Sequence, residues 1–246
     1  PAMPANWVVW QRPDRLSDGR YYVGFTRWLS PKVRMNFGNS WTTHESVVEF
    51  MRFENVDDCP EPRDLTISYH AWGPRALRAP HYLEPLASVA QEPSIVPLPD
   101  GRLFCTMRSM SGYIWYSLSA DAGDTWCVPR PLLRRDFGRP ILEPLCCCPI
   151  YRLADGRYVL LHHNNNGCFE GCRPEETGKN RRPAFLALGE FRPDAEQPIW
   201  FSESKLFMDN GGATIGPLKR IDIGVYPSFT PRRGENILWH PERKFF

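Results

Sequence analysis

The chain of 246 residues, with 42% hydrophobic and 24% charged residues, has the composition of a globular protein and is long enough to bury a large core. Its 30 Lys and Arg residues nearly balance 28 Asp and Glu residues and form no basic block, which excludes the electrostatic footprint of a nucleic-acid-binding protein. No apolar run reaches the roughly 18 residues of a membrane-spanning helix, so we expect a soluble protein without a membrane span.

The eight cysteines include the consecutive residues Cys146, Cys147 and Cys148. Neighbouring strand residues point to opposite faces, so this run is poorly suited to separate structural disulfides. We expect most of the cysteines to be buried thiols that pack as small hydrophobic groups. Such thiols favour a reducing compartment such as the cytoplasm.

One pattern recurs along the chain: a short strand, an Asp-Gly pair and a second strand. It occurs in RLSDGRYYVGF (15–25), PLPDGRLFCTM (97–107) and RLADGRYVLLH (152–162), with a degenerate copy in RRGENILWH (232–240). Asp-Gly is typical of a type I′ turn, in which both central residues adopt positive φ. Each segment therefore predicts a β-hairpin.

The spacing of these hairpins predicts a β-propeller. The first and second copies, and the third and fourth, lie about 80 residues apart, or twice the length of a four-stranded blade. A weaker unit, RDLTISYHAW (63–72), falls in the first gap, and FRPDAEQPIWFSE (191–203) closes the unit opened by Asp155. Helical periodicity is poor throughout. We therefore expect an all-β chain, a single propeller domain over residues 1–246 with about five blade-sized units of four-stranded antiparallel sheet.

The octapeptide SADAGDTW (119–126) keeps a fixed distance from the hairpin before it, as does RMNFGNSW (34–41). The residues that define the pattern are Ser119, Asp121, Gly123, Thr125 and Trp126. In the other copy, the positions of Asp, Gly, Thr and Trp are occupied by Asn36, Gly38, Ser40 and Trp41. An Asp side chain accepts hydrogen bonds from nearby backbone N–H groups, Gly supplies positive φ and Trp packs between sheets. We expect a structural turn remote from any substrate.

The pattern S-x-D-x-G-x-T-W resembles the Asp-box of the sialidase (neuraminidase) superfamily, whose members are six-bladed β-propellers. QEPSIVPLPDGRLFCTMRS (91–109), NRRPAFLAL (180–188) and VYPSFT (225–230) are similar to further segments of that family. The resemblance extends from about residue 85 to the end of the chain and is loose before that. It implies a glycoside hydrolase that removes a terminal acidic sugar of the sialic-acid type with retention of configuration.

By this resemblance Tyr226 is the nucleophile and Glu92 the carboxylate that takes its proton. A phenol, with a pKa of about 10, needs an adjacent base to act as a nucleophile at neutral pH. Retaining sialidases depart from the two-carboxylate scheme of most glycosidases by using tyrosine.

The resemblance also implies that Arg108, Arg181 and Arg12 bind the carboxylate of the substrate. The planar guanidinium group suits this role because it can form two parallel hydrogen bonds with a carboxylate. Arg182 is an alternative to Arg181, since alternate residues of a strand face opposite sides. We expect no cofactor.

The N-terminal part departs from the family pattern. The family has an arginine in an R-I-P motif, followed by a general-acid aspartate. In this chain the nearest arginines are Arg12 in WQRPDRL and Arg27 in FTRW. No aspartate lies between Arg27 and Asp57. Missing N-terminal blades, lost sialidase chemistry and a different acid each account for this difference. The start PAMPANWVVW lacks an initiator Met, and five units against six favour truncation or a divergent first blade.

The segment HHNNNGCFEGC (162–172) precedes the Arg181 strand, so His163, Asn164 and Asn165 are predicted to line the pocket rim and to bind sugar hydroxyls. His162, His163, Cys168 and Cys172 are potential zinc ligands. Their spacing matches the usual paired Cys and His units poorly, and we expect no metal.

Two other functions fit the same residues. A non-catalytic carbohydrate-binding propeller would keep the arginines and lack the acid, and a propeller glycosidase or lyase could recognise another carboxylated sugar through them. In each case the expected partner is a carbohydrate, and the sequence does not specify an oligomeric state.

Overall fold

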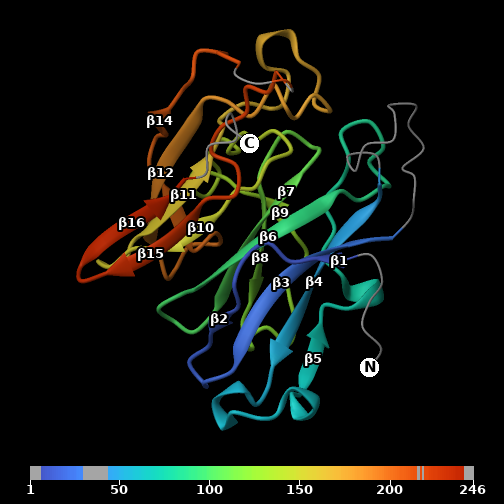
Figure 1. Ribbon diagram of the computed structural model, residues 1–246, viewed down its shortest axis with the longest axis vertical. Coiled ribbons are helices and arrows are strands. Elements are labelled where there is room, and N and C mark those ends of the chain that lie inside the picture. The colour runs from blue at the N-terminus through green and yellow to red at the C-terminus, as the bar shows by residue number, and fades with distance from the viewer. Residues whose placement is uncertain (1–6, 30–43, 215–216, 218, 241–246) are drawn as a thin grey trace. The chain divides into compact units, whose positions relative to one another are not determined.

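The structure is a computed structural model that describes residues 7–29, 44–214, 217 and 219–240 (Figure 1). RMNFGNSW (34–41) lies outside these residues. Strands dominate, and each helix among the described residues is a single 3₁₀ turn, so the all-β prediction is confirmed. None of these turns is long or apolar enough to cross a membrane. The chain divides into two compact units: unit 1 contains Pro1–Met107 and Tyr116–Arg130, and unit 2 contains Arg108–Trp115 and Pro131–Phe246.

The first sheet belongs to unit 1 and has the order β1-β3-β4-β5, with β2 also paired to β3. Its strands are β1 (Trp7–Val8), β2 (Asp14–Arg15), β3 (Tyr21–Trp28), β4 (Ser46–Phe53) and β5 (Ile67–His70). The 3₁₀ turns η2 (Val56–Asp58) and η3 (Pro62–Asp64) connect β4 to β5, and η4 (Gly73–Arg75) follows β5. The segment RDLTISYHAW therefore supplies an edge strand, because β5 pairs antiparallel with β4, and it does not form a blade of its own.

The second sheet is an antiparallel meander in the order β6-β7-β8-β9. It comprises β6 (Ala90–Pro97), β7 (Leu103–Ser109), β8 (Trp115–Ser119) and β9 (Arg130–Pro131). Nearly every residue of β6 and β7 is buried, including the polar or charged residues Gln91, Glu92 and Arg108.

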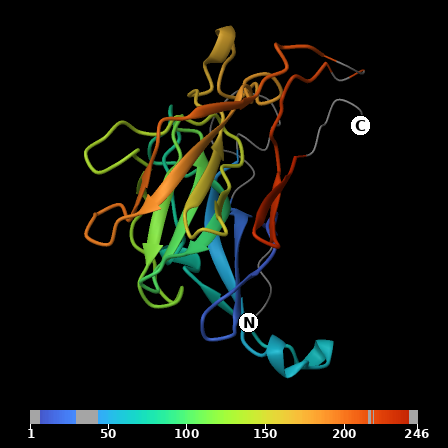
Figure 2. The same ribbon diagram turned by 90° about the vertical axis from the view of Figure 1, so that its left-hand side faces the viewer.

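The remaining sheets belong to unit 2. One has the order β10-β11-β12-β13, with β14 also paired to β12, and the other is the hairpin β15-β16. The strands are β10 (Ile150–Arg152), β11 (Tyr158–His162), β12 (Ala184–Phe191), β13 (Ile199–Phe201), β14 (Lys205–Met208), β15 (Ser228–Arg232) and β16 (Glu235–Trp239). The turn η5 (Phe169–Gly171) lies in the loop between β11 and β12 and projects beyond the ends of these strands (Figure 2). The described residues thus form three blade-sized sheets and one two-stranded hairpin, where the sequence predicts about five units.

The Asp-Gly hairpins form, but their turn is not type I′. In each, the glycine has a φ near +88° and the aspartate does not have positive φ. The glycine N–H donates to the leucine carbonyl three residues earlier, at 3.1 Å for Gly19, 3.1 Å for Gly101 and 3.0 Å for Gly156. This is a type I turn followed by a left-handed glycine, which closes a three-residue loop.

The arginine after each Asp-Gly pair explains the difference. The backbone N–H of Arg102 donates to Asp100 Oδ1 at 3.1 Å, and its Nε donates to Oδ2 at 2.7 Å. Arg157 holds Asp155 in the same way, at 3.0 and 2.8 Å. The carboxylate is therefore satisfied within its own turn, and the aspartate keeps a right-handed conformation.

The SADAGDTW turn of unit 1 is also closed by local hydrogen bonds. Asp121 Oδ1 accepts the backbone N–H of Thr125 at 2.8 Å, and Asp121 Oδ2 accepts its hydroxyl at 2.5 Å. Ser119 Oγ donates to Asp121 and accepts the N–H of Gly123, both at 2.8 Å. Burial raises the pKa of Asp121, but these hydrogen bonds outweigh it and hold that pKa below its ordinary value.

The same turn docks on the first sheet through aromatic side chains. The Trp126 ring stacks on Phe50 with 4.3 Å between centroids, and its Nε1 donates to the Tyr22 hydroxyl at 3.1 Å. That hydroxyl donates to the Gly123 carbonyl at 2.7 Å. The close contact between residue 123 and the Tyr22 ring requires glycine, because a Cβ at residue 123 would lie 2.5 Å from that ring.

We predict that Gly123→Ala lowers the free energy of unfolding by at least about 2 kcal/mol more than Gly101→Ala. Both glycines have positive φ, but a Cβ at Gly101 meets nothing within 4 Å. Gly101→Ala therefore measures only the cost of placing alanine in a left-handed backbone conformation. Chemical denaturation of the two variants provides the comparison. Equal losses would show that the contact with Tyr22 is not restrictive.

We also predict a pH-dependent effect of Asp14→Asn. Burial raises the pKa of Asp14 to about 6, and the nearby Arg12 lowers it only in part. The ionised carboxyl therefore costs stability above pH 6, and this cost disappears as the folded protein takes up the proton between about pH 6 and 4. Asp14→Asn should be more stable than wild type by about 1–3 kcal/mol at pH 7 and equal to it near pH 4. Thermal unfolding at both pH values tests this, and a difference that persists at pH 4 would contradict it.

Candidate functional site

The candidate residues fall in both units, so the geometry is described within each. Unit 2 contains Arg108, His163, Asn164, Asn165, Arg181, Arg182 and Tyr226, and unit 1 contains Arg12 and Glu92.

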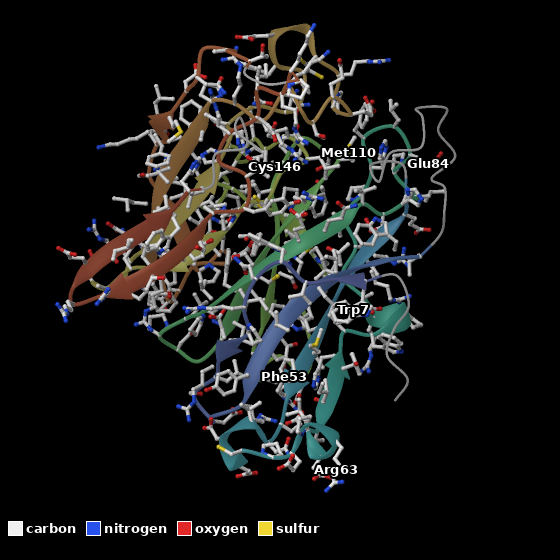
Figure 3. The ribbon with its side chains drawn as sticks, in the orientation of Figure 1. Trp7, Phe53, Arg63, Glu84, Met110 and Cys146 are labelled. Atoms are coloured by element: carbon white, nitrogen blue, oxygen red, sulfur yellow. The ribbon has the colours of Figure 1, made fainter. Side chains whose placement is uncertain are left out.

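The buried segment 143–148 of unit 2 lies at the centre of the site, where Cys146 is labelled in Figure 3. The Leu145 carbonyl accepts two hydrogen bonds from the Arg181 guanidinium, at 3.0 Å from Nε and 2.5 Å from Nη2. The backbone N–H of Tyr226 donates to the sulfur of Cys147 at 3.1 Å. Two candidates that are 45 residues apart in sequence are thereby fixed to one short segment.

His163 is bound to the same segment through Glu143. One carboxylate oxygen of Glu143 accepts the backbone N–H of His163 at 2.6 Å, and the other lies 3.1 Å from the ring Nδ1. The ring Nε2 donates to the Ile223 carbonyl at 2.8 Å. Since that carbonyl is an acceptor, Nε2 carries a proton, and a further proton lies between Nδ1 and the carboxylate. Glu143 is 0% and His163 2% exposed.

The electrostatics of this cluster are strongly perturbed. Burial raises the pKa of Glu143 to about 7, against the opposing effect of His163. Burial would also raise the pKa of the Cys146 thiol, but a hydrogen bond from Cys147 and the positive charges of Arg181 and His163 bring it well below its ordinary value. Perturbed ionisable groups that converge in this way are typical of functional sites.

The backbone is left-handed at three of the residues that the sequence predicts for the site. The φ angle is +52° at Glu92, +51° at Asn164 and +60° at Tyr226. Glu92 lies inside β6, and its N–H donates to the Thr26 hydroxyl at 2.8 Å instead of continuing a regular strand. Such irregularities are common next to active sites, where they redirect a side chain.

The three other arginines have different surroundings. Arg182 is ion-paired with Glu170 and Asp209, at 2.5 and 3.0 Å, and its guanidinium lies over the Phe169 ring. Arg108, near the end of β7, is 3% exposed. Arg12 is exposed in unit 1.

Asn165 holds the loop after β11 together. Its side-chain nitrogen donates to the carbonyls of Asn180 at 3.0 Å, Arg182 at 3.2 Å and His163 at 3.3 Å, while its oxygen accepts the Gly167 N–H at 2.9 Å. Asn164 is half-buried, and its N–H donates to His162 Nδ1 at 3.2 Å. The amide of Asn165 is therefore occupied by backbone groups.

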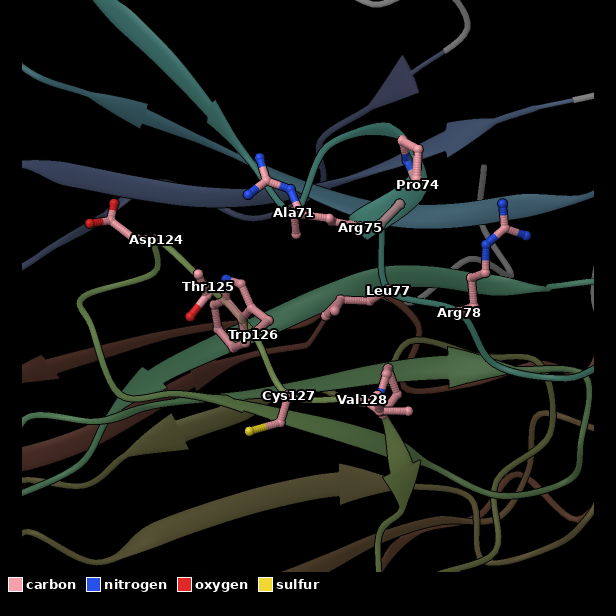
Figure 4. A pocket seen from close by; sticks show the side chains of 12 residues that line it. Ala71, Pro74, Arg75, Leu77, Arg78, Asp124, Thr125, Trp126, Cys127 and Val128 are labelled. Carbon is pink, nitrogen blue, oxygen red and sulfur yellow. The ribbon is translucent and has the colours of Figure 1, made fainter.

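A separate pocket of about 360 Å³ lies in unit 1 (Figure 4). Leu77, Arg78, Trp126 and Val128 are among its lining residues. It includes none of the residues predicted for catalysis or for carboxylate binding.

Sequence reasoning missed Glu143 and assigned Cys146 and Cys147 only to packing. Glu143 lies 20 residues before its partner His163, and no local motif connects them. The one available signal was a glutamate beside the three cysteines in LEPLCCC (142–148).

No model of a known protein family matches the chain, and no curated protein matches it. Among solved structures, NanB sialidase from Streptococcus pneumoniae is similar with 16% identity and a TM-score of 0.50, over 89% of this chain and 25% of that chain. A NanB structure with optactamide gives 15% identity, a TM-score of 0.50 and the same coverage. An exo-1,5-α-L-arabinanase from a bovine ruminal metagenomic library has 14% identity and a TM-score of 0.46, over 93% of this chain and 67% of that chain.

At sequence identities of 15–16%, the similarity to the NanB structures shows a shared fold alone. It agrees with the antiparallel four-stranded sheets and confirms the predicted fold class, an all-β chain built from blades of the β-propeller type. The chain spans about a quarter of the length of the NanB structures, with 25% of each covered.

We predict that Asn165→Ala lowers the free energy of unfolding by about 3 kcal/mol, because several buried backbone groups lose their partner. The neighbouring Asn166→Ala is the control, since Asn166 is exposed and its side chain accepts one backbone N–H, that of Cys168. Its effect should stay below about 1 kcal/mol. Urea denaturation of both variants measures this, and equal effects would contradict the role of Asn165 in the loop.

Proposed function

We propose that this chain is a glycoside hydrolase, or the part of one, that acts on a terminal carboxylated sugar of the sialic-acid type. Tyr226 is the nucleophile in this proposal, and Glu92 is the carboxylate that takes its proton. The likeness of the fold to NanB sialidase is consistent with this assignment.

One observation carries the proposal. Glu92 and Tyr226, which the sequence selects for the chemical step, both have a left-handed backbone. Among the described non-glycine residues, Glu92 is the one with positive φ inside a strand. A conformation that costs about 1–3 kcal/mol persists where the surroundings impose it, and such residues concentrate at active sites.

The arginines support the choice of a carboxylated substrate. Arg108 and Arg181 are both buried in unit 2, the unit that contains Tyr226. We assign the substrate carboxylate to Arg181 rather than Arg182, because the two carboxylates already paired with Arg182 would compete with the substrate. Arg12 completes the set in the proposal.

The decisive experiment is the hydrolysis of an aryl sialoside by the wild type, Tyr226→Phe and Tyr82→Phe. Tyr226→Phe should lower kcat by about 10³-fold or more, because the phenylalanine ring cannot form the glycosyl–enzyme bond. Tyr82, which is 38% exposed, provides the matched control and should keep full activity.

Turnover that survives in Tyr226→Phe would overturn the nucleophile assignment. Absence of wild-type turnover at any pH, together with retained binding of sialic acid, would replace the proposal with a carbohydrate-binding propeller. The missing aspartate between Arg27 and Asp57 is the sequence feature that favours this second function.

A further inference from the structure

The cluster in unit 2 has the composition of a metal site. Single ligand atoms of Glu143, Cys146 and His163 all lie within 4.8 Å of one another, and all three residues are buried. We propose that Glu143, Cys146 and His163 bind one zinc ion through three protein ligands. This inference does not depend on the proposed glycosidase activity.

The distances are close to those that zinc requires. Tetrahedral zinc, with bonds of about 2.0 Å to nitrogen or oxygen and about 2.3 Å to sulfur, separates a nitrogen from an oxygen ligand by about 3.3 Å. The Glu143 oxygen lies 3.1 Å from His163 Nδ1. This separation is within a few tenths of an ångström of the one that zinc requires, and the Cys146 sulfur lies within 4.8 Å of both atoms.

The groups around the ligands are arranged as at a zinc site. A zinc-bound histidine usually donates its other ring N–H to a carbonyl or carboxylate, and here His163 Nε2 donates to the Ile223 carbonyl at 2.8 Å. The second oxygen of Glu143 accepts a backbone N–H, which orients the carboxylate. Two of the three ligands thus have a partner that fixes their direction.

The charges also balance. Zinc with one carboxylate, one thiolate and a neutral imidazole has no net charge, which avoids the cost of an uncompensated charge in a buried site. Mixed thiolate and imidazole ligands favour zinc over magnesium or calcium, which prefer oxygen.

This site differs from the set of ligands considered in the sequence analysis. Only His163 is shared, because the His162 ring contacts the Leu142 carbonyl and the Ser204 hydroxyl, and Cys168 is exposed in the loop. The expectation of no metal followed from the spacing within 162–172. The proposed ligands come from two segments that the fold brings together.

The test is the zinc content and affinity of the full chain, purified in the presence of a reductant and titrated with zinc against a chromogenic chelator. We expect one tightly bound zinc per wild-type chain. Cys146→Ser and His163→Gln should each weaken binding by at least about 100-fold. Cys148→Ser is the matched control from the same cysteine run, and Cys168→Ser is the control for the exposed loop, and both should bind as wild type does.

Wild-type protein alone provides a second measurement, should a variant fail to fold. Replacement of zinc by cobalt should produce the intense charge-transfer absorption of a cobalt–thiolate bond, and Cys146→Ser should abolish this absorption. Wild type without the thiolate band, or zinc binding that is equal in wild type and Cys146→Ser, would overturn the proposal. Loss of binding in Cys168→Ser would move the site to the loop and would overturn it as well.

Discussion

The desolvated carboxylate of Glu143 is the constraint on which the arrangement of unit 2 depends. A fully buried carboxylate costs several kcal/mol unless opposite charge and hydrogen bonds compensate it. His163 provides both, through its backbone and its ring, and the ring extends the connection to Ile223. Three residues further on, Tyr226 is held by the thiol of Cys147. One buried charge therefore couples three parts of unit 2: the end of β11, the segment 143–148 and the segment from Ile223 to Tyr226.

Unit 1 meets a similar constraint by different means. Glu49 in β4 is also 0% exposed, and it accepts two hydrogen bonds from the Arg27 guanidinium, at 2.7 and 2.5 Å, and the Gly73 N–H at 3.0 Å. Arg27 lies on β3, directly beside β4, and is one of the two arginines nearest to the expected R-I-P position. In this unit a guanidinium with a permanent charge compensates the carboxylate. In the Glu143–His163 pair, burial raises the pKa of the Glu143 carboxyl to about 7, so this carboxyl titrates near neutrality.

Local features of the fold could be predicted from the sequence. The Leu-x-Asp-Gly-Arg hairpins depend on contacts within five residues, so the pattern alone predicted their positions. The turn type was wrong because the preference of Asp-Gly for type I′ takes no account of the arginine that follows and binds the aspartate. The segment 63–72 was misassigned because a strand pattern does not reveal its partner, and β5 extends an existing sheet.

The site was less predictable, because its contacts are long-range. A resemblance selected Tyr226 and Arg181, and the position of the loop before the Arg181 strand selected His163. Nothing in the sequence indicated that all three would contact the segment 143–148. Glu143 has no motif of its own, and its function depends on a ring 20 residues away. The cysteine run was assigned to packing by composition, which gives no information on the groups that surround a thiol.

The docking of SADAGDTW on the first sheet has a consequence for how unit 1 folds. The turn itself closes within a few residues, whereas the hydrogen bond from Tyr22 to Gly123 joins residues 101 positions apart. Closing a loop of that length has a high entropic cost, and contacts of this kind slow folding in β-rich proteins. The octapeptide should therefore adopt its turn early, and the stacking of Trp126 on Phe50 should form late. Mutations in this contact should then act mainly on the rate of unfolding and leave the rate of folding almost unchanged.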